Sequence, residues 1–256
     1  MPLVKKSGIG QRLYIHGFDI SSDTGQIDGI GSPIKLLDVA GIDRAAAERI
    51  MGRRDARIAF TAFFNKAADR EHLALKGLPT TDVLAVVLFG TTRGDEMAAI
   101  SAKQPNYDAN IEADGAFGFG VELLGSAGFP LEYGLVLVAK TTSHTSNGSD
   151  ETGINVGTQT AIGAVGFLQH FEDTSPSGTI EYDIEDSSDS TDGDDGSWAN
   201  LLAFSDVATP WAGIAERIVV AGNVEKWTRA STNGTFTNAS FSMSLRRRVS
   251  GDYDAA

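Results

Sequence analysis

The sequence contains no cysteine and only four histidines, and no Lys or Arg occurs between Thr141 and Glu216. The absence of cysteine excludes disulfides, thiolate zinc sites and cysteine nucleophiles. The longest apolar run, residues 83–89, is far shorter than the roughly 18 residues that a membrane span requires. Residues 1–14 have no apolar core of the kind that signal peptides carry. We therefore expect a chain made in a cytoplasm, without an export signal and without a membrane partner.

Common catalytic and nucleotide-binding motifs are absent as well. The sequence has no Gly-x-Ser-x-Gly, His-Glu-x-x-His, Gly-Lys-Ser/Thr or Gly-x-Gly-x-x-Gly segment. The histidines, His16, His72, His144 and His170, are scattered and have no nucleophile at a recognisable spacing. The Asp-rich loop at residues 185–195 offers oxygen ligands for calcium, but it lacks Asp-x-Asp-x-Asp-Gly spacing, so a solvated loop is favoured. We predict no enzyme, no catalytic residue, no cofactor and no metal site.

The charge balance narrows the choice of partners. The formal net charge of the 256-residue chain is −13, and its acids recur through the stretch that has no Lys or Arg. A surface that grips nucleic acid needs Lys and Arg to neutralise phosphates, so nucleic-acid binding and binding to anionic membranes are both disfavoured. With 41% hydrophobic residues, the chain can form one large or two ordinary domains.

The first half of the chain predicts a β domain with two short helices. Strands are expected at residues 13–16, 57–64, 82–89, 97–103, 115–124 and 131–139, and the strand at 82–89 is expected to be buried on both faces. Asp43 and Asn65 are suitable N-caps for helices at 44–51 and 66–76, which Gly52 and Gly77 would end. Residues 1–11 are expected to form a flexible N-terminal arm. The tail-tube-like domain then comprises residues 12–140, and the Ser- and Thr-rich residues 141–155 are expected to form a linker.

The second half, residues 156–250, predicts an acidic β-sandwich domain, followed by a tail at 251–256. Ile180, Tyr182 and Ile184 alternate with acids and predict a strand with one buried face. Strands are also expected at 156–171, 216–220 and 224–230. Asn233-Gly234 favours a hairpin turn, after which residues 239–246 alternate between apolar and polar and predict one buried and one wet face.

Two groups of side chains are candidates for contacts with other molecules. Arg246, Arg247 and Arg248, together with Lys5 and Lys6, are possible subunit-interface residues, because a basic cluster on an acidic protein can pair with a neighbouring copy and give head-to-tail association. Solvated strand ends are the alternative. Trp227 and Arg229 could form a glycan-binding platform, although a strand Trp packed inside a sandwich is more common.

Several segments, distributed over most of the chain, resemble major tail proteins of long-tailed, non-contractile bacteriophages, especially those with actinobacterial hosts. The segments are residues 13–21, 47–50, 60–65, 90–95, 102–104, 106–108, 131–134, 225–229 and 234–237. The resemblance implies a mainly β fold, a tail-tube-like antiparallel sandwich or barrel with short flanking helices plus a second C-terminal β-sandwich. It also implies a structural virion protein, whose copies form rings, usually hexamers, that stack around a conduit through which DNA passes without specific binding.

The predicted strands and the negative charge of the chain are compatible with rings that stack around DNA. Open strand edges endanger a monomer but can pair between copies in a ring, and a negative wall would repel DNA instead of holding it. The expected partners are other copies of the chain and other tail proteins, and the expected location is the phage tail of the virion. Two alternatives remain open, a capsid decoration protein and a C-terminal domain that binds carbohydrate on the host surface.

Overall fold

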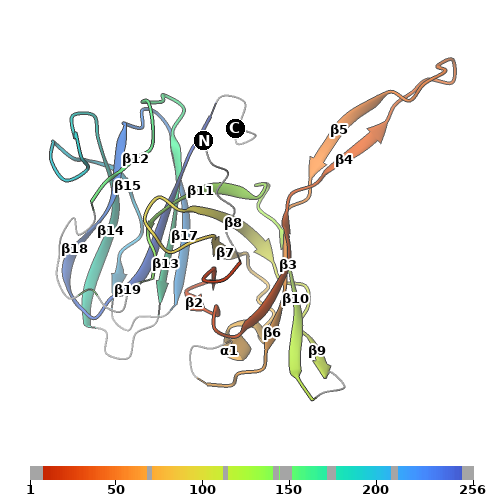
Figure 1. Cartoon of the computed structure of the whole chain (residues 1–256), viewed down its shortest axis with the longest axis horizontal. Coiled ribbons are helices and arrows are strands. Elements are labelled where there is room, and N and C mark those ends of the chain that lie inside the picture. The colour runs from red at the N-terminus through yellow and green to blue at the C-terminus, as the bar shows by residue number, and fades with distance from the viewer. Residues whose placement is uncertain are drawn as a thin grey trace.

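The computed structural model describes residues 8–67, 71–111, 115–140, 144, 152–171, 177–208 and 213–249. The described chain is almost entirely antiparallel β-structure, which confirms the predicted fold class. A single short helix, α1 (Glu71–Leu75), occurs among these residues. Figure 1 shows a curled sheet beside a two-layer sandwich, with one hairpin that projects away from both.

The largest sheet contains twelve strands and runs through both halves of the chain. Its strands are β1 (Arg12–Ile15), β2 (Phe18–Asp19), β3 (Thr24–Gly31), β6 (Arg57–Phe63), β7 (Val83–Leu88), β8 (Glu96–Lys103), β9 (Asp108–Ile111), β10 (Phe117–Gly125), β11 (Glu132–Val138), β13 (Ala164–Phe171), β17 (Ile214–Val220) and β19 (Ser240–Arg247). The halves join where β11 pairs with β19, with Leu135 opposite Leu245. The side chain of Gln169 adds a second link, because it bonds the backbone of Gly17 and of Leu84.

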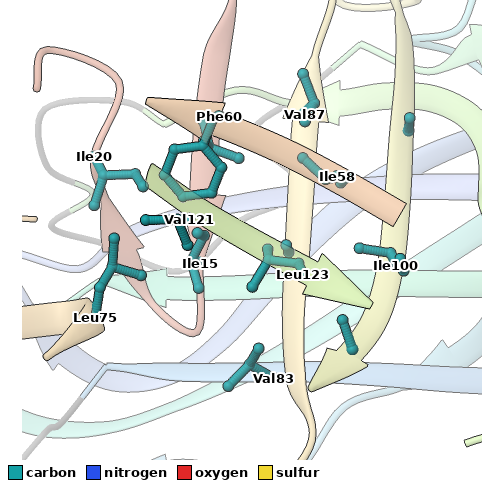
Figure 2. Close-up of a cluster of buried hydrophobic side chains, with 14 of the residues drawn as sticks. Ile15, Ile20, Ile58, Phe60, Leu75, Val83, Val87, Ile100, Val121 and Leu123 are labelled. Atoms are coloured by element: carbon teal, nitrogen blue, oxygen red, sulfur yellow. The ribbon is translucent and has the colours of Figure 1, made fainter. Parts of the chain in front are cut away.

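The first half curls around its own core, shown in Figure 2. Ile58 and Phe60 of β6 lie against Val121 and Leu123 of β10, and Ile100 of β8 belongs to the same cluster. Strand β7 is buried along its whole length, as predicted. Its alternate side chains enter this core and a second apolar cluster that lies between the two halves.

The second half is a sandwich whose outer layer is a five-stranded sheet. Its strands are β12 (Ile154–Asn155), β14 (Ser177–Ser187), β15 (Ala199–Ala203), β16 (Val207–Ala208) and β18 (Trp227–Thr237). Ile180, Tyr182 and Ile184 of β14 point inward and are fully buried, as their alternation predicts. They pack against Phe241 and Met243 of β19.

The predicted turn at Asn233-Gly234 is wrong. Strand β18 continues through both residues and stays paired with β14 from Trp227 to Thr237. Gly234 does have a positive φ of 105°, and a Cβ there would also clash with the Thr179 carbonyl oxygen, so glycine suits the position within a continuous strand. The chain reverses instead at Asn238, with φ 57°, where it passes from the outer sheet into the large sheet.

The wet face predicted for residues 239–246 is also wrong. Ser240, Ser242 and Ser244 are all buried, because β19 lies inside the large sheet and is covered on both sides. The Ser242 hydroxyl donates a hydrogen bond to the Val138 carbonyl oxygen at 2.9 Å. A serine hydroxyl can therefore lie on a buried face when a backbone oxygen accepts its hydrogen bond, as at Ser242.

The helix predicted at residues 44–51 does not form. The chain builds a separate two-stranded hairpin from β4 (Ile34–Asp38) and β5 (Arg49–Arg54). A helix of this length is marginal in water, so its local propensity does not fix the structure, and residues 49–54 pair with residues 34–38 instead. The helix predicted at 66–76 is shorter, and residues 68–70 of it lie outside the described residues.

Candidate assembly surface

The hairpin formed by β4 and β5, residues 34–54, is the most exposed part of the described chain and is called the projecting hairpin below. Every residue from 35 to 51 is exposed. Leu36 pairs with Met51 and Leu37 pairs with Ile50. Because successive side chains of a strand alternate in direction, the two pairs lie on opposite sides of the ribbon. Both sides of the projecting hairpin therefore present large apolar side chains to solvent.

An open pocket of about 530 Å³ lies at the foot of the projecting hairpin. Its walls come from the hairpin and from the turn between β10 and β11. They include the apolar Ile34, Met51, Phe129 and Pro130 and the basic Arg53 and Arg54. The apolar surface of the ribbon thus continues onto the body of the protein.

Strands β6 and β10 carry a second apolar surface at the end that lies away from the projecting hairpin. The pairing of β6 with β10 places Arg57 near the hairpin and Phe63 at the far end. Phe64 and Phe117 are also exposed there, with ring centroids 5.1 Å apart. Phe119 connects them to Tyr107, whose ring stacks on it at 4.0 Å. This surface is called the aromatic end.

The predicted interface arginines are engaged inside the protein. Arg246 donates a hydrogen bond to Glu132 at 2.7 Å, and Arg217 donates two to the same carboxylate at 2.6 and 2.9 Å. The Glu132 side chain is 1% exposed. The Arg217 guanidinium also lies 3.6 Å from the centre of the Phe129 ring. Arg246 thus belongs to a buried ion-pair network that ties β19 to β17 and β11.

The other members of that predicted cluster do not form one patch. The Arg247 guanidinium donates to the carbonyl oxygens of Val156 and Thr158. The backbone N–H of Arg248 donates to the Gly163 carbonyl oxygen, and its side chain is half-buried. Lys5 and Lys6 lie outside the described residues.

Trp227 and Arg229, the predicted glycan contacts, lie on the outer face of the five-stranded sheet. Arg229 stacks on a different ring, with its guanidinium carbon 4.1 Å from the centre of Trp198. It also donates to Glu185 at 2.7 Å. Trp227 is half-buried, and Lys226 lies over its ring at 5.4 Å. The structure thus gives Arg229 two partners that the sequence did not suggest.

The Asp-rich loop after β14 uses its carboxylates to hold its own backbone. Hydrogen bonds from the Thr191 hydroxyl and backbone, and from Ser190, lower the pKa of Asp195 well below its usual range. Bonds from the Ser197 backbone and the Ser187 hydroxyl lower the pKa of Asp189. Among the residues that the structure describes, no group of three or more His, Asp or Glu side chains is arranged to hold a metal ion.

The four histidines contact ordinary structural partners. His72 bonds the Tyr107 hydroxyl at 3.1 Å, and His170 bonds the Tyr182 hydroxyl at 2.6 Å. The His144 ring lies 4.5 Å from Phe241, and burial lowers the pKa of His16. They lie in separate parts of the fold and do not converge on one pocket.

The projecting hairpin was missed as a functional element by the sequence analysis. A signal was present, because Leu36-Leu37 and Ile50-Met51 are apolar pairs on either side of a Gly-containing stretch of mixed polarity. Two adjacent apolar residues place one side chain on each face of a strand, which is the pattern of a ribbon covered on both sides.

No helix in the described part of the chain has the length and apolar character to cross a membrane.

No protein-family model matches the sequence, and no curated protein matches it. Among solved structures, the chain is similar to the Dit (gp 19.1) protein of phage SPP1, described as a paradigm of the hub adsorption apparatus in phages that infect Gram-positive bacteria. The identity is 10%, the TM-score is 0.31, and the match covers 93% of this chain and 99% of the other.

Two further similar structures belong to the phage p2 baseplate in its activated conformation. With strontium, the identity is 10% and the TM-score 0.29, over 93% of this chain and 98% of the other. With calcium, the identity is again 10% and the TM-score 0.30, over 94% and 99%. Similarities with 10% identity and TM-scores near 0.3 do not indicate a function. A function must therefore be inferred from the sequence and the surfaces of this chain.

Proposed function

We propose that this protein is a self-assembling structural subunit of a bacteriophage tail, whose copies form rings that stack into a tube around the DNA. The projecting hairpin carries the proposal. Its apolar side chains are exposed on both faces, and a two-stranded ribbon is marginal in water without a surface to pack against. Other copies of the chain, and other tail proteins, would supply that surface.

The position of the exposed surfaces also supports assembly. The projecting hairpin and the aromatic end lie at opposite ends of β6 and β10. Copies that associate through two different surfaces form rings when the rotation closes and filaments when it does not. In addition, the described strands at the two ends of the large sheet, β3 and β17, each pair on one side only, so they offer edges for pairing between copies.

The particular kind of assembly is supported by the sequence. Segments over most of the chain resemble tail tube proteins, and a net charge of −13 suits a conduit that DNA passes without adhering. The proposed role needs no bound cofactor and no chemical reaction. In the virion, the subunit would lie in the tail.

The proposal is tested with purified full-length protein. We expect sedimentation velocity to show large species as concentration rises, and negative-stain microscopy to show rings or tubes. A chain that stays monomeric across concentration and salt would contradict the proposal. Trimeric knobs that bind phage heads and never stack would identify a capsid decoration protein instead.

A pair of matched variants tests the role of the hairpin. Leu36→Ser with Met51→Ser removes an apolar pair from one face of the ribbon, and we expect assembly to need at least tenfold more protein. Ile9→Ser with Val249→Ser changes two other exposed apolar side chains and should assemble as the wild type does. Equal assembly of both variants would show that the projecting hairpin is not the contact.

A further inference from the structure

Positive charge is concentrated on the projecting hairpin of an otherwise acidic protein. Five of its residues are basic, Lys35, Arg44, Arg49, Arg53 and Arg54, against three acids, Asp38, Asp43 and Glu48. The chain as a whole has a net charge of −13, so the rest of the molecule is more acidic still. A basic ribbon on an acidic body favours association with the acidic surface of another molecule.

Four of these cations have no ion-pair partner in the described part of the chain. They are Lys35, Arg44, Arg49 and Arg53, and all are exposed. By contrast, Arg217 and Arg246 share the buried carboxylate of Glu132. Lys35, Arg44, Arg49 and Arg53 are therefore available to a partner, whereas Arg217 and Arg246 of the body are already engaged.

The matching acidic surface is the outer face of the five-stranded sheet, with the loop that follows β14. The alternation of β14 points Glu181, Asp183 and Glu185 outward, opposite its buried apolar side chains. Asp194 is exposed in the adjoining loop. Asp189 and Asp195 of that loop have lowered pKa values, so they remain ionised at any pH near neutral. This set of residues is called the acidic face.

The acidic face already holds one guanidinium group of its own chain. Arg229 lies against the Trp198 ring and donates to Glu185, which combines stacking with a charge-assisted hydrogen bond. Glu181 accepts no side-chain hydrogen bond from the described residues and remains to bind a further cation. Asp194 accepts none either, although its charge already interacts with that of Arg93 in the same chain.

The two surfaces cannot meet within one molecule. Figure 1 shows the projecting hairpin at one end of the long axis and β18 and β14 at the other. A contact between them must therefore join two copies, and it joins unlike surfaces, which makes the association directional.

We propose that the projecting hairpin of one copy docks through its arginines on the acidic face of a second copy, so that assembly proceeds head to tail. This inference rests on the proposed self-assembly. The sequence suggested Arg246, Arg247 and Arg248 as the basic residues of a head-to-tail contact. We propose that the basic residues of the projecting hairpin make that contact instead.

A charge-swap experiment tests the docking. Arg44→Glu with Arg49→Glu reverses the hairpin, and Glu181→Lys with Asp194→Lys reverses the acidic face. At low salt, each variant alone should need at least tenfold more protein to assemble than the wild type, by sedimentation velocity. An equimolar mixture should recover assembly, because the reversed hairpin then faces a reversed acidic face. Arg12→Glu with Lys76→Glu, exposed residues outside the hairpin and the aromatic end, makes the same change in net charge and should leave assembly unchanged.

The possible results separate this docking site from self-assembly itself. If the mixture does not recover, or if the hairpin reversal is no worse than its control, the docking site is wrong. If the charge variants assemble normally while Leu36→Ser with Met51→Ser does not, self-assembly stands and the acceptor lies elsewhere. If the hairpin reversal only abolishes retention of a DNA oligonucleotide, the arginines serve nucleic acid and the proposal is overturned. A wild type that never assembles would instead remove the proposed function.

Discussion

The projecting hairpin and strand β19 are built from the same kinds of side chain in opposite surroundings. Leu36 and Met51 of the hairpin are 57% and 71% exposed, whereas Leu245 and Met243 of β19 are 2% and 0% exposed. Arg49 has no ion-pair partner in the described residues, whereas Arg246 is held by Glu132. Apolar and basic residues alone do not distinguish these segments, since the strands of both contain them.

The difference between them separates residues that build the fold from residues left for assembly. In β19, apolar and basic side chains are already satisfied by the same chain, so their loss should destabilise the monomer. In the projecting hairpin, Leu36 and Met51 stay largely exposed and Arg49 forms no ion pair with the described residues, so loss of these side chains should affect association more than stability. The substitutions below test whether a particular residue stabilises the monomer.

Removal of Glu132 should have the largest effect on stability. Glu132→Ala leaves Arg217 and Arg246 buried without their shared carboxylate, and breaking a buried ion pair in this way costs about 3–5 kcal/mol. Urea unfolding measures the change. Glu122→Ala is the control, because its contact with Arg57 is exposed and 4.0 Å long, and such pairs contribute about 0–1 kcal/mol. Similar losses in both variants would show that the network does not hold β19 in place.

Two methionine truncations compare the regions directly. Met243→Ala empties part of a packed core and should lower the free energy of unfolding by about 2–5 kcal/mol. Met51→Ala removes an exposed side chain and should change it by no more than about 0.5 kcal/mol. Both values come from the same denaturant titration, at a protein concentration where the wild type is monomeric. A large loss for Met51→Ala would mean that the hairpin packs on its own chain.

Two glycines with similar backbone angles test why Gly234 lies inside a strand. Gly222 and Gly234 have φ values of 102° and 105°, but a Cβ would meet the Thr179 carbonyl oxygen only at Gly234. Both alanine variants are strained, and the additional contact should make Gly234→Ala worse by about 1–3 kcal/mol. Thermal unfolding compares the two. Equal losses would show that backbone conformation alone selects glycine there.

Much of the body was predictable because its strands bury one or both faces. In β14, Ile180, Tyr182 and Ile184 alternate with acids, and in β7 an unbroken apolar run signals two covered faces. Burial of this kind depends on side-chain period, which the sequence contains directly. The serines of β19 were misjudged because their environment depends on which strands lie beside them, a property of the whole fold.

The surfaces proposed for assembly were less predictable. The stretch that includes residues 44–51 has alanines and charges typical of a helix, and nothing local shows that it forms the end of a projecting ribbon. Arg246 also looked available in the sequence, because its acceptor Glu132 is 114 residues away. Neither an isolated ribbon nor an ion pair between distant residues produces a periodic sequence pattern. Only the three-dimensional arrangement therefore shows which residues are exposed and which are already paired.

The smallest predicted effect concerns a second buried glutamate, which contrasts with Glu132. Glu71 is fully buried and forms no ion pair with the described residues, and burial raises its pKa above the ordinary value of 4.5. The folded state therefore binds a proton more tightly than the unfolded state does. The contribution of Glu71 to stability should rise as pH falls through its folded-state pKa toward 4.5, and it should be lowest above that window.

Glu71→Gln removes this titration while keeping the shape of the side chain. We expect the variant to be more stable than the wild type at pH 7.5, with a smaller change than any above, and the advantage should shrink toward pH 4.5. Glu122→Gln, on the exposed ion pair, should show no such trend. A variant less stable than the wild type at pH 7.5 would mean that the ionised carboxylate is stabilised in place. Glu71 would then resemble Glu132, a buried carboxylate whose ionised form is stabilised by its neighbours.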